Sequence, residues 1–418
     1  MEPLKSLHSS VEQVPAPISL RRTLSLPVIT LYGLGTILGA GIYVLIGEVA
    51  RVAQMFAPFA FAIAALIAGF TAFAYAELTA RIPRSAGEAV YVQAAFARNW
   101  LAAGTGWAVV VVGIISAATI AKGVTGYAQL YTQLPAPAIV AILIVALGLL
   151  AAWGVRETAW TAVAVTMAEV FGLLLVIALG GWHIPRADVN WSDLVPPLAS
   201  VPWAGIFAGA FLAFYAFIGF EDMVNMAEEV REPRRNLPLA ILLALVISTL
   251  LYMLVAVVCV VTVPVEVLAT SDAPLAAVIE STGFSAHISI GPIGMVAVVN
   301  GALIQLVMAA RVLYGMGGNG LAATWLASVH PYTRTPLLAT FLVTALALLL
   351  ALTFPLVHLA QATSFVTLII FTTVNLALLR LKRREPRVAG IVSYPRWVPG
   401  TGAILCVGLL LLQFSELL

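Results

Sequence analysis

The sequence predicts an all-α integral membrane protein with about 11 transmembrane helices, and three observations support this fold class. Of the 418 residues, 62% are hydrophobic and only 10% are charged, a composition outside the range of water-soluble domains. Eleven apolar runs are long enough to cross the hydrocarbon core of a bilayer as helices. Two of these runs, five runs apart, contain glycines that would interrupt a helix.

The apolar runs follow one another with brief polar links. The third run is long, and we expect it to tilt or to extend beyond the bilayer. The eleven runs lie near residues 26–48, 57–80, 101–131, 137–153, 158–181, 203–223, 237–263, 289–314, 337–353, 355–379 and 398–416.

The placement of basic residues predicts the orientation. If the N-terminus is cytoplasmic, all of the 21 Lys and Arg residues except Arg51, Arg186 and Lys122 fall in cytoplasmic segments. Positive charge concentrates on the cytoplasmic side of membrane proteins. We therefore expect a multi-pass protein of the cell membrane, surrounded by the lipid bilayer, with an extracytoplasmic C-terminus after the eleventh helix.

Five glycines interrupt the first run, at residues 31–47. Each glycine weakens a helix by roughly 1 kcal/mol relative to alanine. Irregular backbone at membrane depth is tolerated where it is buried in protein or lines a cavity. Gly35 and Gly39 also form a GxxxG pattern, which on its own indicates a close helix crossing.

A second interruption follows in the sixth run, where Gly219 precedes Glu221 and Asp222. Interrupted helices at corresponding positions of two halves are typical of inverted-repeat transporters. We expect a tail at 1–25, repeats at 26–181 and 203–379, and a basic loop with the last helix at 380–418. Freed N–H groups suit a carboxylate and freed carbonyls suit an ammonium, so the breaks predict an amino acid substrate.

Four segments resemble signatures of the amino acid–polyamine–organocation (APC) superfamily of transporters and permeases. The segment GLGTILGAGIYVLIG (33–47) resembles the first-helix signature, and FAYAELTARIPRSAGEAVY (73–91) resembles the end of the second helix. The segment FIGFEDMVNMAEEVREPRRNLPLAI (217–241) resembles the sixth helix and the loop after it. The segment AARVLYGMGGNGLAATWLASVHPYTRTP (309–336) resembles the region after the eighth helix.

The resemblance implies a LeuT-like five-plus-five inverted repeat with discontinuous helices 1 and 6 and alternating access. It places carboxylate-binding N–H groups near Ala40 and Gly41, and amine-binding carbonyls at Ile37, Tyr215 and Ile218. Phe217 resembles the aromatic gate of the sixth helix, and an ordinary packing role is the alternative. The expected substrate-binding residues are Ile37, Gly39, Ala40, Gly41, Tyr215, Ala216, Phe217, Ile218 and Gly219.

Three ionisable residues are candidates for coupling or gating. Glu169 lies midway along the fifth run, where several members of the superfamily carry a lysine thought to stand in for sodium. Because the charge is reversed here, Glu169 either takes a proton, pairs with a cation or makes a structural hydrogen bond, or coupling is absent. Glu221 is a candidate pH sensor or link to the inner gate, or a helix cap. For Lys122 we favour snorkelling to the interface over a functional charge.

The function predicted is secondary active amino acid transport, driven by protons. The candidate pocket residues are uncharged, which favours neutral, apolar substrates. Exchange of amino acids, transport of cationic amino acids or polyamines, and a sensor without flux are the alternatives. No catalytic constellation, metal-ligand spacing or cofactor motif is found, so an enzyme is not expected. The net charge of +2 gives no indication of nucleic-acid binding, and nothing indicates an obligate protein partner.

Overall fold

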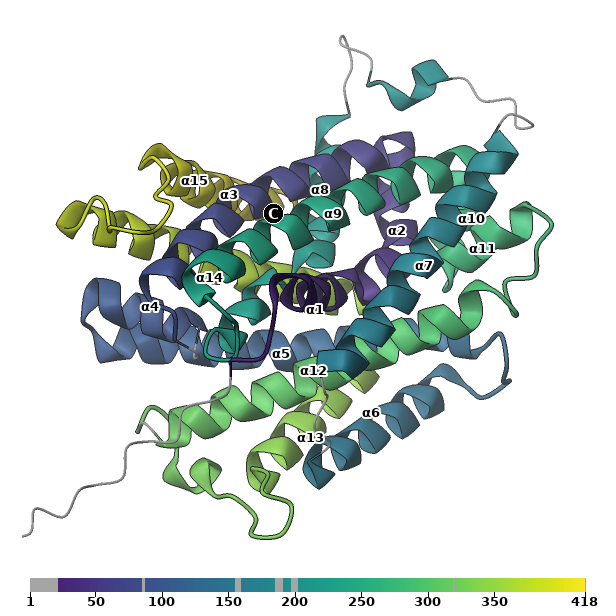
Figure 1. The fold of residues 1–418 in the computed structure, drawn as a ribbon. Helices are drawn as coiled ribbons and strands as arrows, with labels where there is room; N and C mark the ends of the chain where they lie inside the picture. The colour runs from purple at the N-terminus through teal and green to yellow at the C-terminus, as the bar shows by residue number, and fades with distance from the viewer. Residues whose placement is uncertain are drawn as a thin grey trace, which may run out of the picture.

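The fold is a bundle of long helices, seen in a computed structural model that describes residues 22–84, 87–154, 159–184, 191–196, 202–318 and 320–417 (Figure 1). Most of the tail expected at 1–25 lies outside the described residues. Among the described residues, the pairing of extended backbone is limited to one isolated bridge between Leu24 and Val230. The all-α fold class predicted from the sequence is therefore confirmed.

Eleven apolar helical passes run through the described part of the chain. The first pass is divided into α1 (Leu26–Leu38) and α2 (Ala40–Ala53), and the sixth consists of α8 (Trp203–Phe214) and two 3-10 turns. The other passes are α3 (Ala57–Arg81), α5 (Asn99–Ala128), α6 (Ala136–Trp153), α7 (Ala159–His183), α9 (Pro233–Thr262), α12 (Ile290–Gly318), α13 (Leu337–Thr353), α14 (Leu356–Arg384) and α15 (Trp397–Leu417). Shorter helices are α4 (Gly87–Phe96), α10 (Val265–Thr270) and α11 (Pro274–Ser281).

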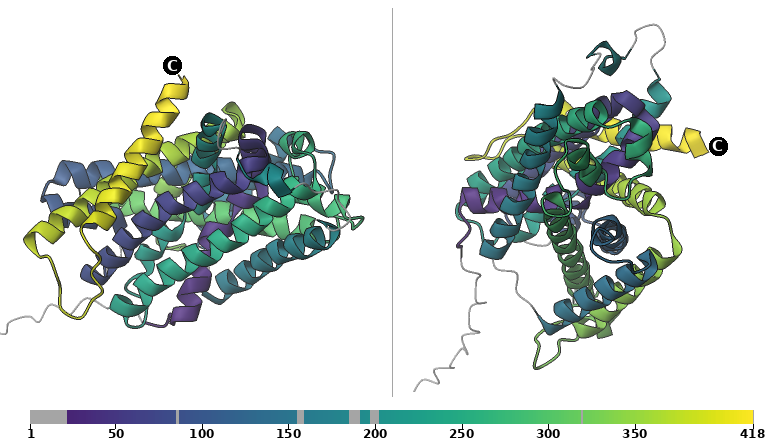
Figure 2. Two further views of the ribbon diagram at one scale, coloured as in Figure 1. Left: turned by 90° about the horizontal axis from the view of Figure 1, so that it is seen from above. Right: turned by 90° about the vertical axis from the view of Figure 1, so that its right-hand side faces the viewer.

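Helices five passes apart pack against each other. Helix α3 packs along α9, α5 along α12 and α6 along α13. In addition, α1 packs on α9 while α8 packs on α3. This reciprocal packing is what two related halves of five helices produce, and it surrounds both interrupted helices with protein. Figure 1 shows α1 near the centre of the bundle, whereas Figure 2 shows α15 leaning away from it at its C-terminal end.

Small side chains recur along the buried part of α3, which packs against α9, α8 and α15. Alanines recur along the buried face of α3 at helical spacing. Inside a membrane the hydrophobic effect does not drive helices together, so helix contacts depend on close packing, which small residues allow. These buried alanines are Ala57, Ala60, Ala64, Ala68, Ala72 and Ala76.

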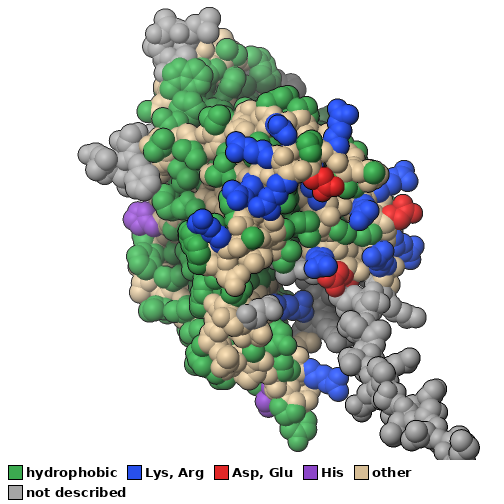
Figure 3. Space-filling view, turned by 90° about the vertical axis from the view of Figure 1, so that its left-hand side faces the viewer, with side chains coloured by type: hydrophobic (Ala, Val, Ile, Leu, Met, Phe, Trp, Pro, Cys, Tyr) green, Lys and Arg blue, Asp and Glu red, His purple; other side chains and the backbone are tan. Residues whose placement is uncertain are grey.

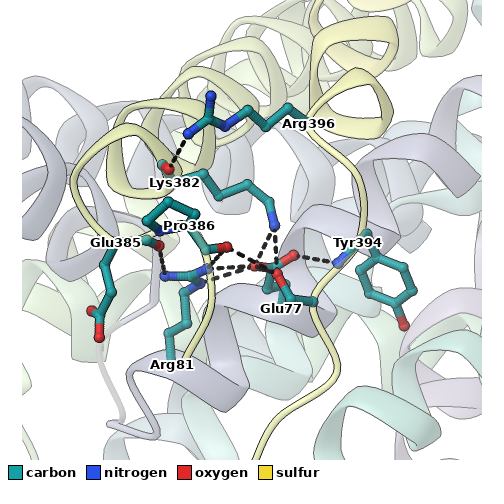
Figure 4. A network of polar contacts seen from close by, with 8 residues as sticks. Glu77, Arg81, Lys382, Glu385, Pro386, Tyr394 and Arg396 are labelled. Atoms are coloured by element: carbon teal, nitrogen blue, oxygen red, sulfur yellow. Dashed lines mark hydrogen bonds and ion pairs between the residues drawn. The ribbon is translucent and has the colours of Figure 1, made fainter. Parts of the chain in front are cut away.

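Basic side chains gather at one end of the molecule, formed by the C-terminal ends of α3 and α14 and by α4 (Figure 3). We call this the basic end. Helix α14 continues to Arg384, so Lys382, expected in the basic loop, lies within a helix and is only 1% exposed. Its ammonium donates a hydrogen bond to buried Glu77, which also accepts hydrogen bonds from Arg81 and from the backbone N–H of Tyr394 (Figure 4). This network ties α3 to α14 and to the segment that leads into α15.

Candidate functional site

The first interruption is a sharp bend at Gly39. Helix α1 ends at Leu38, Gly39 has φ −48° and ψ −140°, and α2 begins at Ala40. The last carbonyls of α1 and the first N–H groups of α2 therefore have no partner in their own helix. Apart from Gly39 itself and its two chain neighbours, no described residue has an atom within 4 Å of where a Cβ on Gly39 would stand, so this side of the bend is open.

The second interruption requires a glycine. After α8, the chain forms a 3-10 turn at Tyr215–Phe217, is extended at Ile218, and then turns at Gly219 with φ 129° into the 3-10 segment Phe220–Met226. Residues with a side chain rarely adopt this φ, and a Cβ at Gly219 would overlap the carbonyl of Thr36. Glycine at position 219 therefore allows the backbone of the second break to lie against the backbone of Thr36 and Ile37.

The two breaks are joined to each other by hydrogen bonds. The hydroxyl of Thr36 lies 2.9 Å from the carbonyl oxygen of Gly219 and 2.9 Å from that of Gly33 in its own helix, so its one hydrogen is shared between them. From α9, the buried hydroxyl of Tyr252 lies 2.7 Å from the carbonyl oxygen of Ile37 and 3.0 Å from that of Ala216. A hydroxyl has one hydrogen to donate, so Tyr252 satisfies two freed carbonyls only in part.

A small central cavity lies between the two breaks and helices α5 and α12. Its volume is about 20 Å³, which is room for one or two water molecules. An amino acid is larger, so binding one requires the surrounding helices to move apart. The lining has no charged side chain and consists of Thr36, Ile37, Gly39, Gly41, Ser116, Ile120, Tyr215, Ile218, Gly301, Ile304 and Gln305.

The structure brings together five of the nine residues that we expected to bind substrate: Ile37, Gly39, Gly41, Tyr215 and Ile218. The other four lie beside the cavity or behind it. Ala40 begins α2, and the position of its side chain lies outside what the structure describes. Ala216 packs under Gly41, and the backbone N–H of Gly219 donates to Glu221 at 2.8 Å.

Phe217 points away from the cavity lining and into an aromatic cluster. Its ring centroid lies 6.5 Å from that of Phe61 and 5.2 Å from that of Tyr252, both in edge-on arrangements. Such arrangements are favourable for aromatic pairs. The ring therefore packs between α3 and α9 in this structure, and its role as a gate stays a prediction.

The sequence analysis did not predict that helices α5 and α12 contribute to the cavity lining. Ser116 and Ile120 come from α5, while Gly301, Ile304 and Gln305 come from α12. The hydroxyls of Ser116 and Tyr215 are 3.1 Å apart. The available signal was an isolated polar side chain in an apolar helix, which describes both Ser116 and Gln305.

Of the three coupling candidates, Glu169 and Lys122 lie away from the cavity lining. Glu169 is fully buried in α7, with its carboxylate against Gly35 of α1, and its backbone carbonyl accepts a hydrogen bond from Tyr43. The ammonium of Lys122 donates to the carbonyl of Ala351 at 3.0 Å, in the last turn of α13. A cation at this position interacts favourably with the C-terminal end of the helix dipole.

The third candidate, Glu221, lines a second cavity of about 10 Å³. Gln305 lines both cavities and therefore separates the central cavity from this one. Asp222 and Glu88 also line the second cavity. Glu88 belongs to the short helix α4, outside the spanning helices, and burial raises the pKa of its carboxyl group.

An all-helical membrane bundle with two broken helices around a central cavity is the architecture of an APC-superfamily transporter. The chain belongs to the amino acid permease family, whose model matches residues 24–415.

Three relatives illustrate the range of the family. The branched-chain amino acid permease BcaP of Bacillus subtilis is 28% identical, over 97% of this chain and 91% of its own length. The mitochondrial cationic amino acid transporter 3 of Arabidopsis thaliana is 32% identical over 88% of this chain, which spans 63% of that protein. The methylthioribose transporter of Bacillus subtilis is 28% identical, over 90% of this chain and 85% of its own length.

Proposed function

We propose that this protein is a secondary active transporter of neutral, apolar amino acids that works by alternating access and is driven by protons. The observation that carries the proposal is the uncharged cavity at which both broken helices meet. Each break frees backbone N–H groups, which attract a carboxylate, and carbonyl groups, which attract an ammonium. The main chain alone can therefore hold a zwitterion.

The lining supports a neutral side chain. Burying an unpaired cation in such a site is costly, and the lining offers no carboxylate to offset that cost. Apolar contacts are available from Ile120, Ile218 and Ile304. A relative named as a branched-chain amino acid permease supports a neutral, apolar substrate. Relatives named as cationic amino acid transporters support the alternative, a positively charged substrate.

The bound amine is expected to compete with Tyr252 for a carbonyl oxygen. The Tyr252 hydroxyl is shared between the carbonyl oxygens of Ile37 and Ala216. An ammonium has three donors, so it can satisfy a carbonyl that the hydroxyl leaves partly unpaired. The carboxylate would then bind the N–H groups at the start of α2.

The proposal of alternating access is supported by the packing of helices five passes apart, which agrees with the two expected halves, 26–181 and 203–379. Movement of α1, α2 and α8 against α5 and α12 would open the central cavity toward one side of the membrane at a time. The basic end would face the cytoplasm of a cell membrane, with the C-terminus on the opposite side, in agreement with the positive-inside rule.

Purified protein in liposomes tests the proposal. We expect uptake of radiolabelled L-leucine, L-isoleucine or L-valine against its gradient, without internal amino acid, when the outside is more acidic. Uptake only with amino acid inside would indicate exchange, and uptake of L-arginine or a polyamine alone would indicate a cationic substrate. Ligand-dependent thermal stabilisation without any flux would indicate a sensor. Liposomes without protein are the control.

A further inference from the structure

Three carboxyl groups converge on the second cavity, although they come from different parts of the chain. Glu88 is contributed by α4, and Glu221 and Asp222 by the 3-10 segment after the second break. All three are at most 8% exposed. Burial together with mutual repulsion makes full ionisation of this cluster unfavourable.

Two further polar atoms line this cavity without a hydrogen-bond partner among the described residues. They are the side-chain oxygens of Gln305, which is 6% exposed, and Thr367, which is 1% exposed. An unpaired buried acceptor costs about 1–3 kcal/mol. The Gln305 amide oxygen can only accept, so it requires an O–H or N–H donor, and a protonated carboxyl group supplies one.

The surroundings supply no positive charge to the cavity lining. Helices α5, α12 and α14 contribute only uncharged side chains to it: Val109, Val112, Gln305, Met308, Thr367, Ile370 and Phe371. The titratable groups facing Glu88 are Tyr75, whose hydroxyl donates to it at 3.0 Å, and Tyr91. No group of three or more His, Cys, Asp or Glu residues with metal-binding geometry occurs in the described part of the chain. A proton can enter this space by forming an O–H bond on one of the three carboxylates.

We propose that Glu88, Glu221 and Asp222 form the proton-binding site that couples the proton gradient to amino acid transport. Proton binding forms one O–H bond on a carboxylate and removes one negative charge from the cluster. The inference rests on the proposed transport function and extends it by naming the coupling site, which is distinct from Glu169.

Two contacts link the cluster to the substrate cavity. The Gln305 amide nitrogen donates to Asp222 at 3.1 Å, and the same side chain lines the central cavity. The Glu221 carboxylate accepts from the Gly219 N–H at the second break. Protonation therefore changes hydrogen bonding at both the cavity wall and the broken helix. A protonated cluster favours the closed conformation, and a fully ionised cluster favours one that admits water.

The test compares proteoliposomes containing wild-type protein, E88Q, D222N, E169Q and the control E280Q. Glu280 is an exposed carboxylate on α11 and lines neither cavity, so its substitution removes one charge without changing either lining. Uptake of radiolabelled L-leucine, L-isoleucine and L-valine is measured with an acidic exterior. Exchange is measured separately at equal pH. A gradient of about one pH unit supports about ten-fold accumulation when one proton moves with each substrate.

Wild type, E280Q and E169Q should accumulate substrate, whereas E88Q and D222N should lose accumulation and still exchange internal for external substrate. Full accumulation by E88Q and D222N, or its loss in E169Q alone, would overturn the assignment. Wild-type uptake that ignores the pH gradient would overturn the coupling site and leave amino acid transport intact. If no tested amino acid is moved, the transport proposal itself fails.

A second measurement does not depend on flux. The infrared spectrum of the purified protein should contain a protonated-carboxyl band that weakens in E88Q and D222N and not in E280Q. A spectrum in which these variants leave that band unchanged would refute the proton site, even if the variants had lost all transport.

Discussion

Removal of the charge on Glu77 is expected to destabilise the protein more than any surface substitution. The Glu77 side chain is fully buried, and the side chains of its partners Arg81 and Lys382 are only 5% and 2% exposed. Its Oε1 atom lies 2.8 Å from Arg81 Nη2 and 2.6 Å from Lys382 Nζ, while Oε2 accepts from the Tyr394 N–H at 2.9 Å. The E77Q variant would leave two buried cations without a counter-charge.

Breaking a buried ion pair in this way costs about 3–5 kcal/mol. We expect E77Q to lower the free energy of unfolding by this amount, measured from unfolding equilibria in mixed micelles of a mild detergent and SDS. The surface control E280Q should change it by less than about 0.5 kcal/mol.

A double-mutant cycle separates the ion pair from other effects of the substitution. K382M removes the positive charge of Lys382, which E77Q alone would leave unpaired. The double variant E77Q/K382M should therefore lose less free energy of unfolding than the two single variants lose together. We expect a coupling energy of about 2 kcal/mol. Additive losses, or an E77Q variant as stable as E280Q, would refute the view that these groups stabilise the fold as a unit.

Three further substitutions test the central cavity. G41A should lose substrate-dependent thermal stabilisation, because a Cβ there would overlap the Ala216 backbone; unchanged stabilisation would contradict the site. In the matched variant G301A a Cβ meets only ordinary contacts, at 3.5 Å or more, so the protein should fold normally and bind substrate more weakly, and unaltered affinity would argue against that wall of the cavity. Y252F should lower the free energy of unfolding by about 1–3 kcal/mol, since two buried carbonyls lose their donor; an unfolding equilibrium equal to that of wild type would show that other groups satisfy them.

The elements that the sequence predicts well depend on local pattern. Hydrophobic runs of sufficient length identify the passes, and the glycine-containing stretches indicate that the first and sixth passes are interrupted. The exact position does not follow from glycine alone: the first break lies at Gly39, whereas Gly33, Gly35, Gly41 and Gly47 lie within α1 or α2. The fold class and the presence of two broken helices are nevertheless predictable from the amino-acid sequence alone.

The contacts that the sequence did not predict depend on packing between segments far apart in the chain. Nothing near Tyr252 in the sequence indicates that its hydroxyl reaches carbonyls 215 and 36 residues away. Glu88 follows Arg81 and Arg84 in an apparently polar link, and only the packing of α4 against α5 and α14 brings it to the cavity of Glu221. Periodicity identifies which residues are buried, but it does not identify the partners they meet.

The mutual hydrogen bonding of the two broken helices has a mechanical consequence. The Thr36 hydroxyl reaches the Gly219 carbonyl, and the Tyr252 hydroxyl of α9 reaches the carbonyls of both Ile37 and Ala216, so separating the two breaks costs hydrogen bonds at each of them. We therefore expect the two breaks to move together as one unit, so that a substitution at either break alters the backbone conformation of both.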